Sequence, residues 1–187
     1  MLAGVELTLA DMDAIAVTVG PGSFTGLRIG IATAKAFCQA LQKPAIPIIT
    51  LDALAYQGRG LADWICPILD ARKNELYCAL YHKWGRQILP PDAMTPESLG
   101  RLLAEKEGDV LFLGDGALPS RERLQPFLGG RYHLASPERR LFLADAAALL
   151  ACEKLAAGET VEAAALAPFY LRVSEAERKR QESLKNA

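Results

Sequence analysis

The sequence predicts an α/β protein made of two related units. Apolar, β-branched runs of strand length alternate with helical patterns between residues 13 and 58. From residue 64 onward the predicted order is two strands, a third short strand, and then three helices alternating with two strands. The first unit, β-α-β-α, therefore matches only the later half of the second.

The first unit is too short to be an independent sheet. Residues 13–19 predict a strand ending at Gly20, and residues 27–41 predict a helix. Residues 44–49 predict a second strand, whose prolines favour an edge, and Thr50 is the expected N-cap of a short helix. Because two parallel strands cannot bury both of their faces, this unit either takes strands from another chain or lacks its natural beginning.

The second unit opens with a predicted hairpin and closes with a long helix. Residues 64–70 and 75–83 predict its two strands, joined by the tight turn "ARKN". A third strand is expected at 86–89, and a helix follows with Thr95 as N-cap and Pro96 at its first position. The remaining elements are a strand in "DVLFLGDG", a helix near 119–128, a short strand near 131–134 and a helix over 139–157.

Composition narrows the classes of protein to consider. The chain has 187 residues and a net charge of −1, so no global positive field favours nucleic-acid or membrane binding. We interpret its four cysteines, which form no CxxC pair, as reduced core residues of a cytoplasmic protein. The helix over 139–157 carries Asp145, Glu153 and Lys154, which excludes a membrane span.

A glycine-rich loop separates the first strand from the first helix. A strand–loop–helix of this kind can hold an anion on free backbone N–H groups. Gly20, Gly22 and Gly26 give G-x-G-x-x-x-G, one residue longer than the dinucleotide fingerprint. A phosphate-binding P-loop needs a lysine after the last glycine, where this chain has Leu27 and Arg28.

Catalytic residues are scarce near the loop. Ser23 and Thr25 could act as nucleophiles only beside a base, and the chain's two histidines, His82 and His133, are far away in sequence. We therefore expect no catalytic residue and no metal site.

The helix after the loop is apolar on most sides. Arg28, Lys35 and Gln39 fall on one narrow stripe, and Gly26, Gly30 and Ala34 form a row of small residues. The pattern fits either a helix buried within one domain or a helix held between its own sheet and a partner protein.

The segment "GPGSFTGLRIGIATAKAF" resembles the signature of the bacterial TsaB (YeaZ) family, and the resemblance continues through "ILDARKNELYCALY", "LGDGA" and "PFYLR". It implies an actin-like (ASKHA, RNase H-like) fold of two domains. Residues 1–60 would form an N-terminal subdomain lacking its initial strands and first helix. Residues 61–160 would form the second subdomain, and 161–187 a C-terminal segment and charged tail.

The resemblance also implies a function. TsaB-like proteins are regarded as non-catalytic partners of TsaD, which forms N6-threonylcarbamoyladenosine in tRNA that reads ANN codons, and a TsaE-like ATPase joins them. A homodimer, only indirect contact with tRNA, and no cofactor are further expectations. The catalytic H-x3-H pair of TsaD is missing here. The alternative is a nucleotide-binding enzyme or a glycoprotease-like metallopeptidase of the same fold.

Two sets of site residues follow from the resemblance. A helix-bundle interface with TsaD or a second TsaB would include Phe24, Leu27, Gly30, Ile31, Ala34, Phe37 and Cys38. The loop would be a degenerate phosphate-type loop that sets the entry of this helix, comprising Gly20, Pro21, Gly22, Ser23, Thr25, Gly26 and Arg28.

Overall fold

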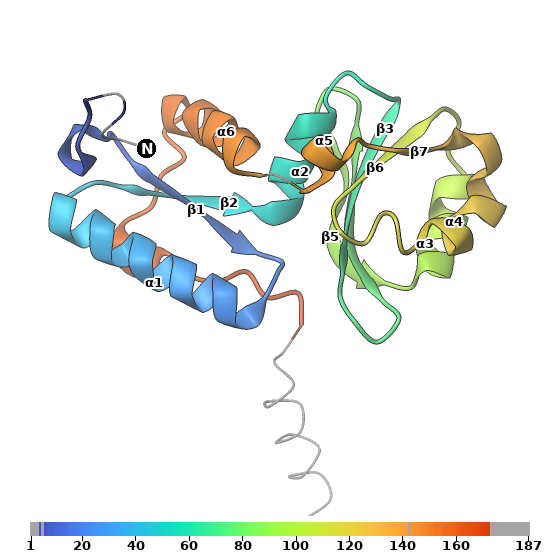
Figure 1. Ribbon diagram of the computed structural model, residues 1–187, viewed down its shortest axis with the longest axis horizontal. Helices are drawn as coiled ribbons and strands as arrows, with labels where there is room; N and C mark the ends of the chain where they lie inside the picture. Colours follow the sequence, from blue (N-terminus) through green and yellow to red (C-terminus); the bar gives the residue numbers. More distant parts are fainter. Residues whose placement is uncertain (1–3, 5, 142, 173–187) are drawn as a thin grey trace, which may run out of the picture.

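The computed structural model describes residues 4, 6–141 and 143–172 and arranges them as two lobes side by side (Figure 1). In the N-terminal lobe, β1 (Ile15–Gly20) pairs in parallel with β2 (Ala45–Ile49). Helices α1 (Phe24–Leu41) and α6 (Ala144–Ala156) lie on opposite faces of this two-stranded sheet. Both faces of this sheet are thus covered by helices.

The C-terminal lobe contains a five-stranded sheet in the order β5-β4-β3-β6-β7. Helices α3 and α4 cover one face of it, and α2 covers the other. The bounds are α2 (Thr50–Gly58), β3 (Trp64–Asp70), β4 (Leu76–His82), β5 (Gln87–Met94), α3 (Pro96–Ala104), β6 (Val110–Leu113), α4 (Arg121–Leu128), β7 (Tyr132–Leu134) and α5 (Pro137–Leu141).

The core of the C-terminal lobe is closed. Phe112 on β6 is fully buried and stacks on Tyr132, with ring centroids 4.3 Å apart. The Tyr132 hydroxyl donates to the Ala117 carbonyl at 2.6 Å, so this buried polar group has a partner. Leu99 and Leu124, from α3 and α4, complete the packing on the same face.

Several predicted boundaries need correction. The predicted helix over 139–157 is two helices, α5 and α6. α6 packs on Ile46 and Ile48 of the first sheet, so a second domain ending at 160 is wrong for this helix. Thr50 is the first residue of α2 rather than its N-cap, which is Ile49. Thr95 does cap α3, accepting the Ser98 N–H at 3.2 Å.

Residues 160–172, the C-terminal strap, cross from α6 along α1 to the region between the lobes (Figure 1). Val161 exchanges two backbone hydrogen bonds with Ala45, each 2.8 Å. The Phe169 N–H donates to the carbonyl of Val19 at 2.8 Å. Arg172 then pairs with Glu75 and donates to the Ala71 carbonyl of the other lobe. Residues 173–187, most of the predicted tail, lie outside the described residues.

Among the described helices, none is long and apolar enough to cross a membrane.

Candidate partner-binding surface

The glycine loop starts α1. Ser23 is the N-cap, and its Oγ accepts the Gly26 N–H at 3.3 Å. The Leu27 N–H donates to the Ser23 carbonyl at 2.8 Å, so the helix begins one turn earlier than the predicted residue 27. Pro21 is buried, while Gly22 and Thr25 are exposed. The capping serine thereby sets the direction in which α1 leaves the sheet.

Gly20 is required by the strap. Its φ is +130°, a conformation that L side chains rarely adopt, and an added Cβ would lie 2.4 Å from the carbonyl oxygen of Phe169. Gly22 is different, because the nearest atom to a Cβ there is 3.9 Å away. The first glycine of the motif therefore serves close packing of the chain on itself.

One side of α1 is part of the lobe's core. Leu27, Ile31, Ala34 and Cys38 are each no more than 8% exposed and pack against β1, β2 and the strap residue Leu166. Burial raises the pKa of the Cys38 thiol. Their assignment to a partner interface is wrong, because the helical period turns all four toward the chain's own sheet.

A second side of α1 contacts the strap. Phe24 stacks on Tyr170 with ring centroids 4.9 Å apart, and the Arg28 guanidinium lies 4.0 Å above the Phe24 ring. The Arg28 Nε donates to the Tyr170 hydroxyl at 3.2 Å. Lys35 Nζ donates to the Ala164 carbonyl at 3.3 Å. Two of the three polar residues that the sequence placed on one stripe are thus occupied by the strap.

The third side of α1, called here the bare flank, is exposed and uncharged. Ile29 is 63% exposed and Phe37 is 38% exposed. The other residues on this side are small and also exposed: Ala32, Thr33, Ala36 and Ala40. Of the other predicted interface residues, Gly30 and Phe24 are half-buried. Such a contiguous apolar surface on a helix is typical of a protein–protein contact.

The open edge of β1 lies next to this helix. The Ile15 N–H donates to the Pro44 carbonyl, on the β2 side. Since backbone groups alternate along a strand, Ala16 and Thr18 direct theirs to the opposite edge, which no described strand covers. A groove of about 220 Å³ at the loop is lined in part by Val17, Thr18, Gly22, Gly26 and Gly30.

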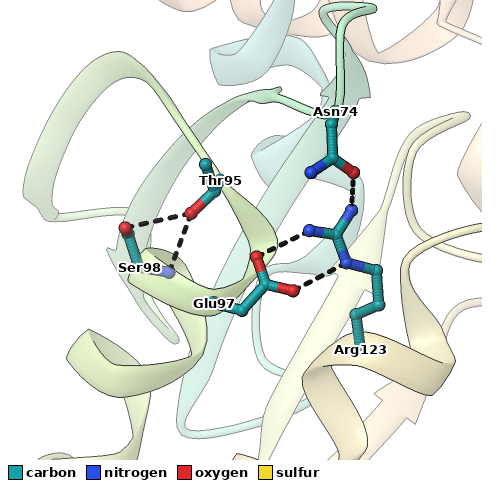
Figure 2. Close-up of polar contacts among 5 residues, drawn as sticks. All are labelled: Asn74, Thr95, Glu97, Ser98 and Arg123. Carbon is teal, nitrogen blue, oxygen red and sulfur yellow. Dashed lines mark hydrogen bonds and ion pairs between the residues drawn. The ribbon is translucent and has the colours of Figure 1, made fainter.

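In the C-terminal lobe, a polar clamp holds the end of the β3–β4 hairpin (Figure 2). Arg123 on α4 binds Glu97 on α3 through two hydrogen bonds of 2.7 and 2.6 Å. The same guanidinium donates to the side-chain oxygen of Asn74 in the hairpin. Its hydrogen bond to Glu97 lowers the pKa of that carboxyl. This is the hairpin that receives Arg172, so the strap ends on a fixed support.

A half-buried carboxyl, that of Asp52, joins α2 to the C-terminal sheet. The Tyr81 hydroxyl donates to Asp52, and Gln87 donates to the Tyr81 oxygen at 3.3 Å. Burial raises the pKa of Asp52, although the hydrogen bond from Tyr81 opposes this. Burial, followed by the charge of Asp52, raises the pKa of Tyr81. The pair supports packing between α2 and β4.

Comparison with known proteins places this architecture in a family. A family model described as TsaD, tRNA N6-adenosine threonylcarbamoyltransferase, matches residues 1–121. The tRNA threonylcarbamoyladenosine biosynthesis protein TsaB of Bacillus subtilis (strain 168) is 34% identical over 183 residues, covering 96% of this chain and 78% of that protein. TsaB of Escherichia coli (strain K12) is 31% identical, with 88% and 73% covered. The chain belongs to the TsaB family.

Solved structures agree with the TsaB assignment. YeaZ from Pseudomonas aeruginosa superposes with a TM-score of 0.76 at 28% identity, covering 91% of this chain and 80% of that one. A protein of the same organism, described as similar to peptidase YEAZ, gives a TM-score of 0.77 at 29% identity, with 91% and 79% covered. The predicted actin-like α/β fold is thereby confirmed.

The two histidines of this TsaB-family chain lie apart. His82 packs edge-on against Trp64, and His133 Nε2 lies 3.1 Å from an Asp109 carboxylate oxygen. Among residues 4, 6–141 and 143–172, no three His, Cys, Asp or Glu side chains are grouped as metal ligands.

Sequence reasoning missed the most exposed interface candidate and the strap. Ile29 lies on the side of α1 opposite Leu27 and Ile31. A helical wheel that placed those two residues in the core would have identified Ile29 as a surface residue. Arg28 and Tyr170 are 142 residues apart in the sequence, so no local pattern predicts their contact.

Proposed function

We propose that this TsaB-family chain is a partner subunit that supports a TsaD-like transferase in forming N6-threonylcarbamoyladenosine in tRNA that reads ANN codons. In this proposal the chain carries none of the catalytic residues. One observation supports it most: the bare flank of α1 presents Ile29, Phe37 and small residues to solvent without a single charge. A subunit whose role is to bind another protein needs such a surface.

Covering the bare flank would contribute to association. Fully burying an exposed large apolar side chain contributes about 1.5–3 kcal/mol, and Ile29 and Phe37, which are partly exposed, would each supply a fraction of that amount. The alanines between them let a partner helix approach closely, as small residues do at helix contacts. The open edge of β1 lies near this flank and would extend the contact with backbone hydrogen bonds.

Further assignments rest on the same proposal. A TsaE-like ATPase would join the complex, a homodimer would use the same flank in the absence of the TsaD-like partner, and tRNA would be contacted only indirectly. The expected compartment is the cytoplasm.

A nucleotide-binding enzyme or a glycoprotease-like peptidase is not favoured. Arg28, the nearest cation to the glycine loop, is bonded to Tyr170 and stacked on Phe24. The Phe169 carbonyl occupies the space beside Gly20. Gly20 therefore packs against the strap, and Arg28 is held at its Nε by Tyr170 and at one face of its guanidinium by Phe24.

The proposal is tested by introducing a charge on the bare flank. Ile29→Asp and Phe37→Asp should each weaken binding of the TsaD-like subunit of the same organism by about tenfold or more, measured by isothermal titration calorimetry. Leu149→Asp is the matched control, because Leu149 is 55% exposed on α6, on the other face of the same sheet. The assignment of this flank would be contradicted if all three variants lost binding affinity equally, or if none of them lost any.

A further inference from the structure

At the margin of the bare flank, α1 and the strap together fix one guanidinium. Arg28 stacks on the Phe24 ring at 4.0 Å, and its Nε donates to the Tyr170 hydroxyl at 3.2 Å. Tyr170 is itself stacked on Phe24. These contacts use the ring-facing side and the Nε of the group. Within the described residues, its two Nη atoms have no protein partner.

A guanidinium held in this way is suited to bind a carboxylate. Its two Nη groups offer donors in one plane, and the strap has already restricted the side-chain rotations that binding would otherwise have to freeze. Arg28 is exposed, so the donors are accessible. Arginine and tyrosine beside an apolar patch are also the residue types that most often dominate binding energy at protein interfaces.

The charge on α1 indicates what kind of partner would bind there. The helix contains Arg28 and Lys35 and no acidic residue. Lys35 donates to the strap carbonyl of Ala164 and is only half-exposed, whereas Arg28 is exposed and lies beside the stacked rings of Phe24 and Tyr170. Ala32, a residue of the bare flank, lies one turn further along the helix, so a protein covering that flank would come within reach of Arg28.

We propose that Phe24, Arg28 and Tyr170 form a carboxylate anchor, which takes an Asp or Glu side chain of the partner protein that covers the bare flank. This rests on the proposed function and adds to it a polar contact and a role for the strap. The strap positions Arg28, and the partner's carboxylate bonds to the Nη atoms. The anchor fixes the register of the partner along α1, which an uncharged flank alone specifies weakly.

The test uses two variants that lose the same internal bond. Arg28→Met and Tyr170→Phe both remove the hydrogen bond between Arg28 and Tyr170, but only Arg28→Met removes the charge. Calorimetry with the TsaD-like subunit should show binding weakened about tenfold for Arg28→Met and by less than about threefold for Tyr170→Phe. Added salt should weaken the wild-type complex more steeply than the Arg28→Met complex.

Other outcomes would overturn the anchor. Equal losses in the two variants would show that the bond only holds the strap, and wild-type binding by Arg28→Met would remove the anchor altogether. If Arg28→Met lowered binding of tRNA but not of the protein subunit, the ligand would be a phosphate and the proposal would be wrong. Ile29→Asp separates this from the proposed function: its failure to weaken binding would refute the docking flank, whatever Arg28 does.

Discussion

The two lobes share an α/β plan but differ in how completely they cover their own surfaces. The C-terminal lobe has five strands, and Phe112 and Leu99 in its core are fully buried. The N-terminal lobe has two strands, an open strand edge and a helix with an exposed apolar side. The difference fits the proposed function: the C-terminal lobe provides a stable core, and the N-terminal lobe would provide the binding surface. Binding surface is necessarily drawn from the less protected part of a protein.

The largest expected effect tests whether the lobes unfold independently. Phe112→Ala should lower the free energy of unfolding by about 3–5 kcal/mol, since it removes a fully buried stacked ring. Leu27→Ala in the N-terminal lobe should lower it by about 2 kcal/mol. Hydrogen exchange read peptide by peptide should place each loss in the mutated lobe. Equal deprotection of both lobes by either variant would show a single cooperative unit and break the comparison.

The next effect concerns the strap that the N-terminal lobe depends on. Gly20→Ala should lower the unfolding free energy by about 2–3 kcal/mol, because the new Cβ collides with the Phe169 carbonyl and φ is positive. Exchange of the Phe169 amide should accelerate with it. Gly22→Ala is the control and should change stability by no more than about 0.5 kcal/mol. A similar cost at both glycines would argue against the strap as the reason for Gly20.

A smaller effect is expected at the polar clamp of the C-terminal lobe. Arg123→Met should lower the denaturant midpoint by less than Gly20→Ala does, because the Arg123–Glu97 pair is partly exposed. The pair lowers the pKa of Glu97, so its stabilisation is present above the ordinary pKa of 4.5 and is lost as pH falls through the lowered value. The difference between wild type and variant should therefore narrow in acid, where only the bond from Arg123 to Asn74 remains. A difference that stayed the same across this pH range would exclude the ion pair as its cause.

The smallest effect is a pH dependence at Asp52. Its pKa is raised in the folded chain, so the folded state holds the proton more tightly than the unfolded state. Stability should fall as pH rises from the ordinary value of 3.8 through the raised one. Asp52→Asn should flatten that part of the profile, measured by urea unfolding at a series of pH values. An unchanged slope in the variant would assign the dependence to other groups.

Much of the fold was predictable because its signals are local. Runs such as "DAIAVTV" predicted β1, and Thr95 followed by Pro96 predicted the start of α3. The break between α5 and α6 was missed, since the apolar pattern continues across it.

The candidate surface was predictable only in part. Apolar residues around most of α1 indicated a partner, but periodicity alone could not decide which side faced the sheet. The structure turns Leu27 and Ile31 inward and leaves Ile29 and Phe37 outside. The role of Arg28 depends on Tyr170, which is distant in sequence, so no motif search centred on the loop would identify it.

The position of the strap has a consequence for the order in which the chain is made. β1 and α1 emerge early from the ribosome, yet their partner Tyr170 follows Arg28 by 142 residues. At about 5–20 residues per second, α1 waits roughly 7–28 seconds for the strap residues that cover it. The C-terminal lobe, whose strands are closer in sequence, can finish first. The N-terminal lobe then completes its packing only after the strap has been made. Until that time its open strand is accessible to chaperones and proteases.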